Sequence, residues 1–422
     1  MRVQIKAMGL GPYGFARIDE SPGSIGKIVM VPNTAPGDLA EVEIVRDHRD
    51  YSVGRLRALL APGAARRPAP CEYLPRCGGC DWQQIDYRAQ VKIKGELIAH
   101  ELNRVLNCAI DPVGLVEPAS DEFGYRSRIR LRVSRNLRLG FNQFGTNQVV
   151  EIERCMVGAA EIRIPHFLPA VLGGGCEEVE IVADRAALIA VAKLKRPPDQ
   201  QAIARTRRAL EAEGSLKGVI VRAGKSRRRL GDVRTSIEVE PGLAVELDAD
   251  LFTQVNHAQN RALVSCVMER AALADGSRVL DLFCGAGNFS LPAARRGAQV
   301  TAFDCDPLAI AAALANAQRL GLQENARFSA IEAKETAQFL LRAGYRTQLL
   351  ILDPPRAGAA ELTAPMLKLR PERIIYVSCD VATLARDLKA LRGGGYRLNF
   401  VRGFDFFPNT HHAEVVAEAV LT

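Results

Sequence analysis

The pattern of apolar and polar positions changes twice along the chain. Over residues 1–58 the two classes alternate in short runs separated by Gly and Pro-Gly turns. This pattern predicts several short strands and a small β-barrel of the OB type. The Pro- and Ala-rich run at 61–70 is typical of a linker, and the following stretch predicts a helix at 87–105 and then further strands.

From residue 251 onward, strand-like and helical runs alternate regularly. The apolar runs LDLF, VTAF, LLIL and IIYV are each followed by a stretch with helical spacing, which predicts a parallel, doubly wound α/β sheet. The last two runs, RLNFVRGFDFF and AEVVAEAVL, have no helix between them and predict an antiparallel hairpin at one edge. We therefore expect a β-barrel at 1–58, a mixed α+β region at 59–250 and a Rossmann-like α/β domain at 251–422.

Composition and charge narrow the class of protein. The net charge of +8 and the pI near 9.0 favour an anionic partner, although mild basicity is also common without one. The N-terminus has no apolar segment of signal-peptide length, and no run approaches the ~18 apolar residues of a membrane span. We therefore expect a cytoplasmic protein with no membrane partner. Thiols stay reduced there, so the ten cysteines are expected to be metal-binding, catalytic or buried.

A cofactor site is predicted at the end of the first strand of the α/β domain. The run ending at Leu282 leads directly into Cys-Gly-Ala-Gly-Asn, where glycines let a ligand approach the backbone. Ser290 replaces the third glycine of a dinucleotide fingerprint, so nothing is adapted to a pyrophosphate. Asp281 is placed to accept from a cationic amine, and Asp304 to bind ribose hydroxyls. The set fits a nucleoside that carries an amino acid, with an NAD-binding fold as the alternative.

A candidate nucleophile follows a later strand. Cys379 lies at the tip of the run RIIYVS, on the edge where the cofactor is expected, but position alone does not distinguish a nucleophile from a small packing residue. Upstream, Asp353-Pro-Pro-Arg forms a stiff turn. Arg356 stands where amino-methylating enzymes carry an aromatic residue, which weighs against attack on an exocyclic amine. Three other cysteines of this domain are expected to be packing residues: Cys266, Cys284 and Cys305.

Methylation of a pyrimidine carbon requires such a cysteine. C5 of uracil is a poor nucleophile, and a thiolate that adds to C6 creates an enolate able to attack a methyl sulfonium. A base must then remove the C5 proton so that the thiolate can leave. Glu414, which follows two histidines and starts the last strand, is the candidate base. A surface acid in a loop is the alternative role for this residue.

Several motifs together resemble one family. LDLFCGAGNFSLP, LDPPRAG, YVSCDVATLARDL and FDFFPNTHHAE occur in the order seen in the RNA uracil-5 methyltransferase family, and LFTQVN at 251–256 resembles its F-x-Q-x-N stretch. The resemblance implies a class I methyltransferase domain with S-adenosylmethionine as methyl donor. It implies that Cys379 is the nucleophile and Glu414 the base. It also implies donor contacts at Gln254, Phe283, Asn288, Asp304, Glu332 and Asp353.

Two positions depart from the family pattern. Asp380 follows the cysteine where the family usually has Asn, and Ala413 precedes the glutamate where it usually has Val or Ile. Neither side chain is expected to touch a reacting group. A negative charge at Asp380 would nevertheless raise the pKa of the Cys379 thiol.

A cysteine cluster lies in the central region. Three cysteines fall within ten residues: Cys71, Cys77 and Cys80. Cys155 is the candidate fourth ligand, with Cys108 and Cys176 as competitors. The spacing C-x5-C-x2-C differs from the paired C-x2-C of zinc ribbons and favours an iron–sulfur cluster over zinc, while a metal-free loop is a third option. Family members with an N-terminal TRAM-type barrel hold a [4Fe–4S] cluster with this spacing, so the resemblance implies that cluster here.

Residues that would contact RNA are expected in two places. Alternation in SRIRLRVS places four arginines on one face of a strand: Arg126, Arg128, Arg130 and Arg132. A row of one sign favours phosphate contact over a merely solvated face, and we expect such contact from the first three. Candidates for stacking on RNA bases are Phe404, Phe406 and Phe407, although aromatic residues beside a strand end are more often core.

The combination of barrel and cluster bears on the substrate. It resembles the 23S rRNA branch of the family, because the tRNA enzymes lack both features. We therefore expect a monomeric uridine-C5 methyltransferase whose partner is 23S rRNA. The alternatives are a tRNA uridine-C5 methyltransferase, a cytosine-C5 RNA methyltransferase and a non-catalytic iron–sulfur RNA-binding protein. The cytosine enzyme is disfavoured because no Pro-Cys pair occurs near the active strands.

Overall fold

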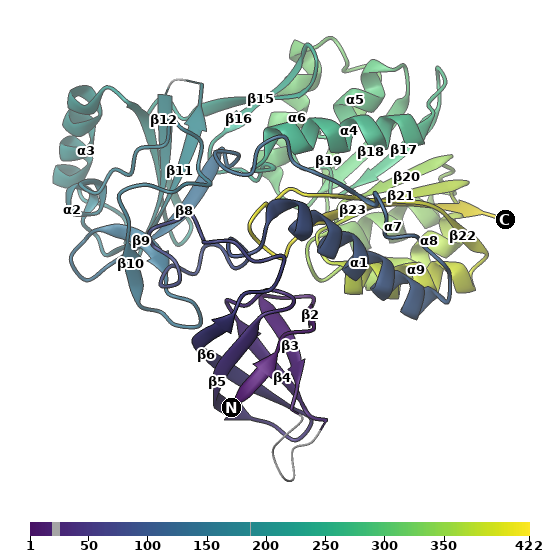
Figure 1. Cartoon of the computed structure of the whole chain (residues 1–422). Coiled ribbons are helices and arrows are strands. Elements are labelled where there is room, and N and C mark those ends of the chain that lie inside the picture. Colours follow the sequence, from purple (N-terminus) through teal and green to yellow (C-terminus); the bar gives the residue numbers. More distant parts are fainter. Residues whose placement is uncertain (19–25, 186) are drawn as a thin grey trace.

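The computed structural model describes residues 1–18, 26–185 and 187–422, which form three large β-sheets and a separate two-stranded sheet (Figure 1). The N-terminal sheet has the strand order β1-β5-β6-β4-β3-β2. Because β1 contacts β3 as well as pairing with β5, this sheet curls around its own small core of Val3, Ile5, Val29, Val31 and Val42. Its strands are β1 (Arg2–Gln4), β2 (Ala7–Met8), β3 (Tyr13–Arg17), β4 (Ile28–Pro32), β5 (Leu39–Asp47) and β6 (Tyr51–Ala61).

The central region is a seven-stranded sheet in the order β10-β9-β8-β11-β12-β13-β14. The pair β12–β13 is parallel and is connected by α3 (Gln200–Glu213), while the other pairs are antiparallel. A parallel pair needs such a crossover, since a tight turn joins only antiparallel strands. The elements are β8 (Arg128–Val133), β9 (Leu139–Asn142), β10 (Val149–Glu151), α2 (Leu168–Leu172), β11 (Cys176–Asp184), β12 (Ala187–Leu194), β13 (Leu216–Ala223) and β14 (Ser226–Gly231).

The C-terminal sheet has the strand order β19-β18-β17-β20-β21-β23-β22-β7. The strands from β19 to β21 run parallel, and β23 is antiparallel to both of its neighbours, so the predicted α/β sheet with an edge hairpin is confirmed. Its strands are β7 (Val116–Glu117), β17 (Arg278–Leu282), β18 (Gln299–Asp304), β19 (Ala326–Ala330), β20 (Leu349–Leu352), β21 (Arg373–Ser378), β22 (Tyr396–Phe404) and β23 (Glu414–Leu421).

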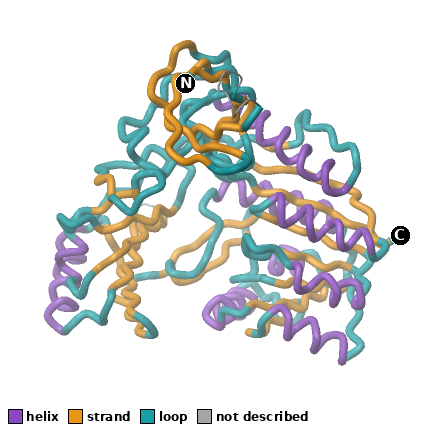
Figure 2. Tube along the Cα trace, turned by 90° about the horizontal axis from the view of Figure 1, so that it is seen from below, coloured by secondary structure: helices purple, strands orange, loops and turns teal. Residues whose placement is uncertain are grey.

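Helices cover both faces of this sheet (Figure 2). On one face, Leu263, Leu291 and Ile310 pack against strand residues such as Ile351. On the other, Leu340, Met366 and Leu388 do so. The first face carries α4 (His257–Ala271), α5 (Ser290–Arg295) and α6 (Pro307–Arg319); the second carries α7 (Ala333–Arg342), a 3-10 turn (Ala360–Leu362), α8 (Thr363–Leu369) and α9 (Val381–Gly393).

Two segments from the 59–250 stretch pack on the C-terminal sheet. The predicted helix is α1 (Tyr87–Leu106), and its buried Ile98 and Leu102 join the core on the α9 side. After it, β7 (Val116–Glu117) pairs with β22 at the sheet edge. The hairpin of β15 (Arg234–Glu240) and β16 (Leu243–Asp248) contacts α4 and α6. Helical spacing indicated that α1 has an apolar face, but it could not indicate which sheet that face covers.

A buried ion pair attaches α1 to the end of the C-terminal sheet. Lys94 Nζ donates to Asp405 Oδ1 at 2.6 Å and to the Phe407 carbonyl at 3.1 Å. Both charged side chains are almost fully buried, at 1% and 0% exposure. Nζ lies 6.0 Å from the centre of the Trp82 ring. Each charge depends on the other, because an unpaired charge in the interior is strongly unfavourable.

We expect Lys94→Met to lower the free energy of unfolding by about 3–5 kcal/mol, since it leaves the Asp405 carboxylate buried and unpaired. Urea unfolding followed by tryptophan fluorescence measures this, and the protein's single tryptophan, Trp82, lies beside the pair. Lys92→Met on the same helix is the matched control, since Lys92 is exposed and lies 3.8 Å from Glu96. A loss no larger than the control's would contradict the expectation.

Candidate active site

The candidate site lies at the carboxyl ends of the parallel strands. The chain proceeds from β17 outward to β18 and β19 and then returns to the other side of β17 with β20 and β21. Ligands of open α/β sheets bind where the strand order reverses in this way. Phe283, Asp304, Asp353 and Cys379 each directly follow or end one of these strands.

The glycine turn after β17 is held in an unusual backbone conformation. Phe283 has φ +68°, which is uncommon for a residue with a side chain, and its N–H donates to the Phe303 carbonyl at 3.0 Å. Gly287 has φ +99°, and a Cβ there would lie 2.8 Å from Leu291 Cγ. A Cβ on Gly285 would meet nothing within 4 Å, so this side of the turn is open. The turn therefore presents backbone to the space above the sheet.

Two carboxylates flank this turn. Asp281 is fully buried and accepts from Ser290 Oγ, while its Oδ1 has no hydrogen-bond partner in the described part of the chain. Burial, with Asp353 and Asp304 nearby, raises the pKa of Asp281 to about 7. Asp304 accepts from the N–H groups of Gly285 (2.9 Å) and Asp306 (2.8 Å). An unpartnered buried acceptor beside an oriented carboxylate fits a ligand with a cationic amine and a ribose.

The remaining predicted donor contacts are distributed around the same edge. Asn288 forms a reciprocal amide pair with Asn260 of α4, at 2.9 and 3.1 Å. Glu332 precedes α7, next to Ile331, whose N–H donates to the Asp304 carbonyl at 2.9 Å. Gln254 is partly buried in the extended stretch before α4. Asn260 was not predicted from the sequence. The pattern that could have identified it is a polar residue on the apolar face of a helix.

Cys379 and Glu414 lie beside each other across two paired strands. Ser378 of β21 is opposite Val415 of β23, so the next residues outward are the cysteine and the glutamate. Burial, followed by the charges of Glu414 and Asp353, raises the pKa of the Cys379 thiol to about 11, and the Arg356 cation opposes this rise. Burial, followed by the charge of Asp353, raises the pKa of Glu414 well above its usual range.

Arg356 supplies positive charge to this group of acids. Its Nη2 lies 3.4 Å from His412 Nε2, and its carbonyl accepts from Thr383 Oγ1 at 3.2 Å. Asp387 of α9 accepts from the Ala359 N–H at 2.7 Å and from Tyr376 Oη at 2.8 Å. The Asp353–Ala359 turn is thus fixed to α9, the helix that begins after Cys379.

The Asp380 carboxylate caps a helix and is not among the causes of the raised pKa of the Cys379 thiol. It accepts from the Thr383 N–H at 2.9 Å and caps the N-terminus of α9. The causes of the raised Cys379 pKa are burial, Glu414 and Asp353. The departure from the usual asparagine therefore leaves the helix cap intact.

The four predicted cluster ligands come together from distant parts of the chain. Cys155 is close enough to Cys71, Cys77 and Cys80 for their charges to interact, and all four are free thiols. The Gly79 N–H donates to Cys77 Sγ at 3.4 Å. Within residues 1–18, 26–185 and 187–422, however, no three Cys, His, Asp or Glu side chains have the arrangement of a metal site. The donor set suits an iron–sulfur cluster in ligand type and number.

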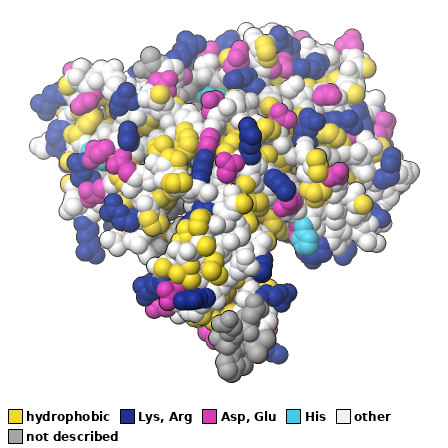
Figure 3. All heavy atoms as spheres, in the orientation of Figure 1, with side chains coloured by type: hydrophobic (Ala, Val, Ile, Leu, Met, Phe, Trp, Pro, Cys, Tyr) yellow, Lys and Arg dark blue, Asp and Glu magenta, His cyan; other side chains and the backbone are white. Residues whose placement is uncertain are grey.

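The arginine row is not the unpaired basic face that was predicted. Arg128 is buried and donates to the Leu251 carbonyl at 3.0 Å and to the Ala249 carbonyl. Arg130 and Arg132 pair with Glu178 and Glu180 of the neighbouring strand. The face of the molecule in Figure 3 accordingly carries cations and acids close together. Single-strand alternation cannot show that the adjacent strand carries the opposite charge.

The predicted stacking aromatics are also corrected. Phe404 and Phe406 are core residues with 1% and 0% exposure, so they cannot stack on RNA. Phe407 is partly exposed, packs edge-on against His412 with ring centres 6.1 Å apart, and has the Arg126 guanidinium 5.4 Å from its centre. Among the cysteines expected to be packing residues, Cys305 is instead exposed.

Two family models match the chain. The model described as tRNA (uracil-5-)-methyltransferase matches residues 198–418, and the TRAM domain model matches residues 1–56. A 23S rRNA (uracil(1939)-C(5))-methyltransferase of Thiobacillus denitrificans is 32% identical over 440 residues, covering 98% of each chain. A relative from Pseudomonas putida with the same description is also 32% identical, over 99% of this chain and 92% of its own.

The fold of the whole chain matches a solved structure. The Pyrococcus abyssi tRNA (uracil-54, C5)-methyltransferase, in complex with S-adenosyl-L-homocysteine, superposes with a TM-score of 0.75 over 100% of both chains at 24% identity. No helix in the described part of the chain is long and apolar enough to cross a membrane. The chain therefore belongs to the tRNA (uracil-5-)-methyltransferase family, and it is an S-adenosylmethionine-dependent enzyme that methylates C5 of uracil in RNA.

Proposed function

We propose that the enzyme methylates C5 of a uridine in 23S rRNA, with Cys379 as nucleophile and Glu414 as base. The observation that carries the proposal is the adjacency of these residues across β21 and β23, at the sheet edge with the glycine turn. The 23S rRNA substrate is supported by the relatives of that description. The N-terminal barrel does not separate the two substrates, because the Pyrococcus abyssi tRNA enzyme matches the whole chain, barrel included. A tRNA substrate is the alternative, supported by the description of the family model.

The proposed reaction consists of thiolate addition, methyl transfer, and proton removal with loss of the thiolate. The Cys379 thiol loses its proton to solvent, and the thiolate adds to C6 of the uracil, which places the displaced π electrons in an enolate over C5 and O4. C5 then takes the methyl group, and the donor leaves as the neutral thioether. The Glu414 carboxylate accepts the C5 proton, and its electrons re-form the C5–C6 double bond as the thiolate is expelled. Glu414 finally returns that proton to solvent.

The surroundings of the two residues suit these steps. Burial keeps the Glu414 carboxyl in a dry environment, which strengthens its basicity once it is charged. The Arg356 cation lowers the pKa of Cys379 and favours the thiolate. The donor is held by residues on the same edge, each proposed from the family motifs and its place beside the glycine turn: Gln254, Phe283, Asn288, Asp304, Glu332 and Asp353.

A [4Fe–4S] cluster is proposed at Cys71, Cys77, Cys80 and Cys155. Support comes from the convergence of four reduced thiols near the backbone N–H of Gly79. A cluster there would link the segment 71–80 to the β10–α2 connection. The proposed methylation needs no electron donor or acceptor, so the contribution of the cluster would be structural.

Cys379→Ala is expected to abolish methylation while leaving binding of S-adenosylhomocysteine unchanged by calorimetry, since the thiol contacts the uracil and not the donor. Wild-type enzyme with 5-fluorouridine RNA should form a denaturation-resistant adduct, because fluorine at C5 cannot be removed as a proton. If wild-type enzyme forms no adduct with a 5-fluorouridine version of a 23S rRNA fragment that it methylates, the covalent route is ruled out. Comparing transfer to purified rRNA and tRNA separates the two substrates.

Alkylation of Cys379 by iodoacetamide is expected to accelerate about tenfold per pH unit from pH 7 towards pH 10, because only the thiolate reacts and its pKa is about 11. Peptide mass spectrometry measures this site by site. Arg356→Gln should slow the reaction at each pH, since it removes the cation that lowers this pKa. An alkylation rate that levels off near pH 8 would show that the pKa of the Cys379 thiol is not raised.

Protein purified without oxygen is expected to contain about four iron atoms per chain and to absorb visible light, because four thiolates complete a [4Fe–4S] site. Cys155→Ala should lose both signals. Cys176→Ala is the matched control, since Cys176 bonds its own strand's Glu178 carbonyl at 3.8 Å. Zinc in place of iron, or equal iron in both variants, would contradict the assignment.

A further inference from the structure

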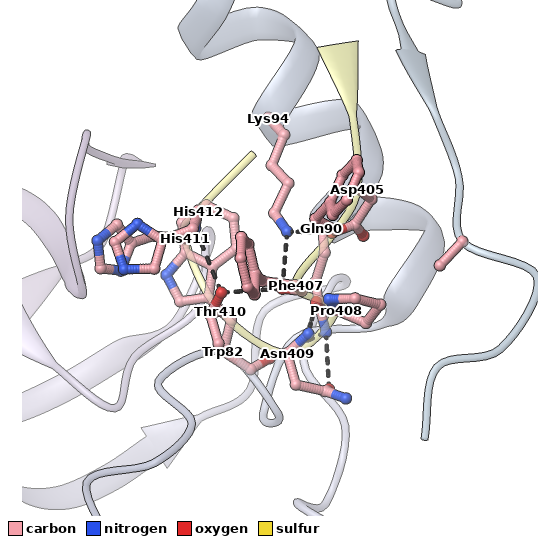
Figure 4. A network of polar contacts seen from close by, with 12 residues as sticks. Trp82, Gln90, Lys94, Asp405, Phe407, Pro408, Asn409, Thr410, His411 and His412 are labelled. Carbon is pink, nitrogen blue, oxygen red and sulfur yellow. Dashed lines mark hydrogen bonds and ion pairs between the residues drawn. The ribbon is translucent and has the colours of Figure 1, made fainter. Parts of the chain in front are cut away.

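The connection between β22 and β23 leads directly into Glu414, the first residue of β23. Residues from outside the C-terminal sheet hold this connection in place (Figure 4). We call residues 405–413 the base arm. Its centre is Asn409, which is fully buried and has φ +67°. A residue with a side chain persists in this conformation only where its surroundings fix it.

The backbone of Asn409 is bound on both sides. Its carbonyl accepts from the N–H groups of Asp81 at 3.1 Å and Trp82 at 3.0 Å, the two residues after Cys80. Its N–H donates to Gln90 Oε1 of α1 at 2.8 Å. The cysteine segment and α1 therefore both hold the same peptide unit.

The side chain of Asn409 is equally occupied. Oδ1 accepts from Gln90 Nε2 at 3.2 Å and from Arg67 Nη2 at 3.0 Å. Nδ2 donates to the Glu122 carbonyl at 3.0 Å. Every polar group of this buried residue thus has a partner, and the partners come from residues 67 to 122, far from it in sequence.

Asp81 makes a second, two-point contact with the base arm. Its Oδ1 accepts from the His411 N–H at 3.1 Å, and its Oδ2 lies 2.6 Å from His411 Nδ1. Both side chains remain about one-fifth exposed, at 17% and 21%. This contact lies three residues before Glu414, and no residue between them belongs to a strand.

The nucleophile and the base have separate supports. Cys379 is fixed from the α9 side, where Ser378 Oγ donates to the Asp380 carbonyl at 2.9 Å and Asp380 caps the helix. The base arm is fixed from a different part of the chain, residues 67–122, which includes Asp81, Gln90 and Lys94. Loosening the arm should therefore shift Glu414 while leaving Cys379 in place, and a displacement of about 1 Å is enough to slow a reaction substantially.

We propose that Asp81, Asn409 and His411 are positioning residues for removal of the C5 proton, acting through the base arm on Glu414. This inference rests on the proposed role of Glu414 as the base. It gives the segment after Cys80 a function in removal of the C5 proton. This segment holds the base arm, and the base arm sets the position of the Glu414 carboxyl. Thiolate addition and methyl transfer use Cys379, which this contact does not touch.

Asp81→Ala, His411→Ala and the double variant test the proposal, with uridine RNA and radiolabelled donor. Each variant should form a methylated protein–RNA adduct at a rate near wild type and release product about tenfold more slowly, so that the adduct accumulates on denaturing gels. The double variant should be no slower than the slower single, because both remove one contact. His411→Ala removes the same contact without changing the cysteine segment. It therefore tests the proposal even if Asp81→Ala folds poorly.

Glu96→Ala is the matched control, since this half-exposed carboxylate on α1 pairs only distantly with Lys92, at 3.8 Å. It should release product as wild type does. The inference is overturned if no adduct accumulates in the variants. It is also overturned if the variants form the adduct more slowly and bind RNA more weakly. Failure of wild-type enzyme to trap 5-fluorouridine RNA would instead overturn the proposed function, so the two failures are distinguishable.

Discussion

The pairing of β23 between β21 and β22 is the constraint on which the active site depends. Ser378 is opposite Val415, and Phe404 is opposite Glu414, so one register places the cysteine, the glutamate and the base arm at a single edge. A slip of one residue would turn Glu414 to the other face of the sheet. Because β23 is buried on both faces and paired on both edges, such a slip would also place its side chains against the wrong neighbours on both sides of the sheet.

Burial makes this edge chemically unusual. Asp281, Asp353 and Glu414 all have raised pKa values, and Arg356 is the cation that counters them at Cys379. A sulfonium donor brings a positive charge into such a region and is favoured by the acids around it. The same surroundings raise the pKa of the Cys379 thiol, which leaves it protonated near neutral pH.

The front part of the chain supports the site as well as carrying its own sheets. Lys94 pairs with Asp405, Gln90 with Asn409 and Asp81 with His411, and each contact crosses more than 300 positions of sequence. The α1 helix belongs by its packing to the C-terminal sheet. The segment that carries three of the four predicted cluster ligands is therefore continuous with the support of residues 405–413, the base arm.

The sequence by itself determined the α/β alternation, the edge hairpin, the glycine turn and the motif residues, because spacing along a strand or helix decides which residues share a face and which follow a strand end. Only the tertiary structure decided what lies across from them. Glu178 and Glu180 neutralise the arginine row, the core absorbs Phe404 and Phe406, and Asn260 engages Asn288. Each of these partners comes from a separate element, and the packing that brings them together leaves no periodic signal in the chain.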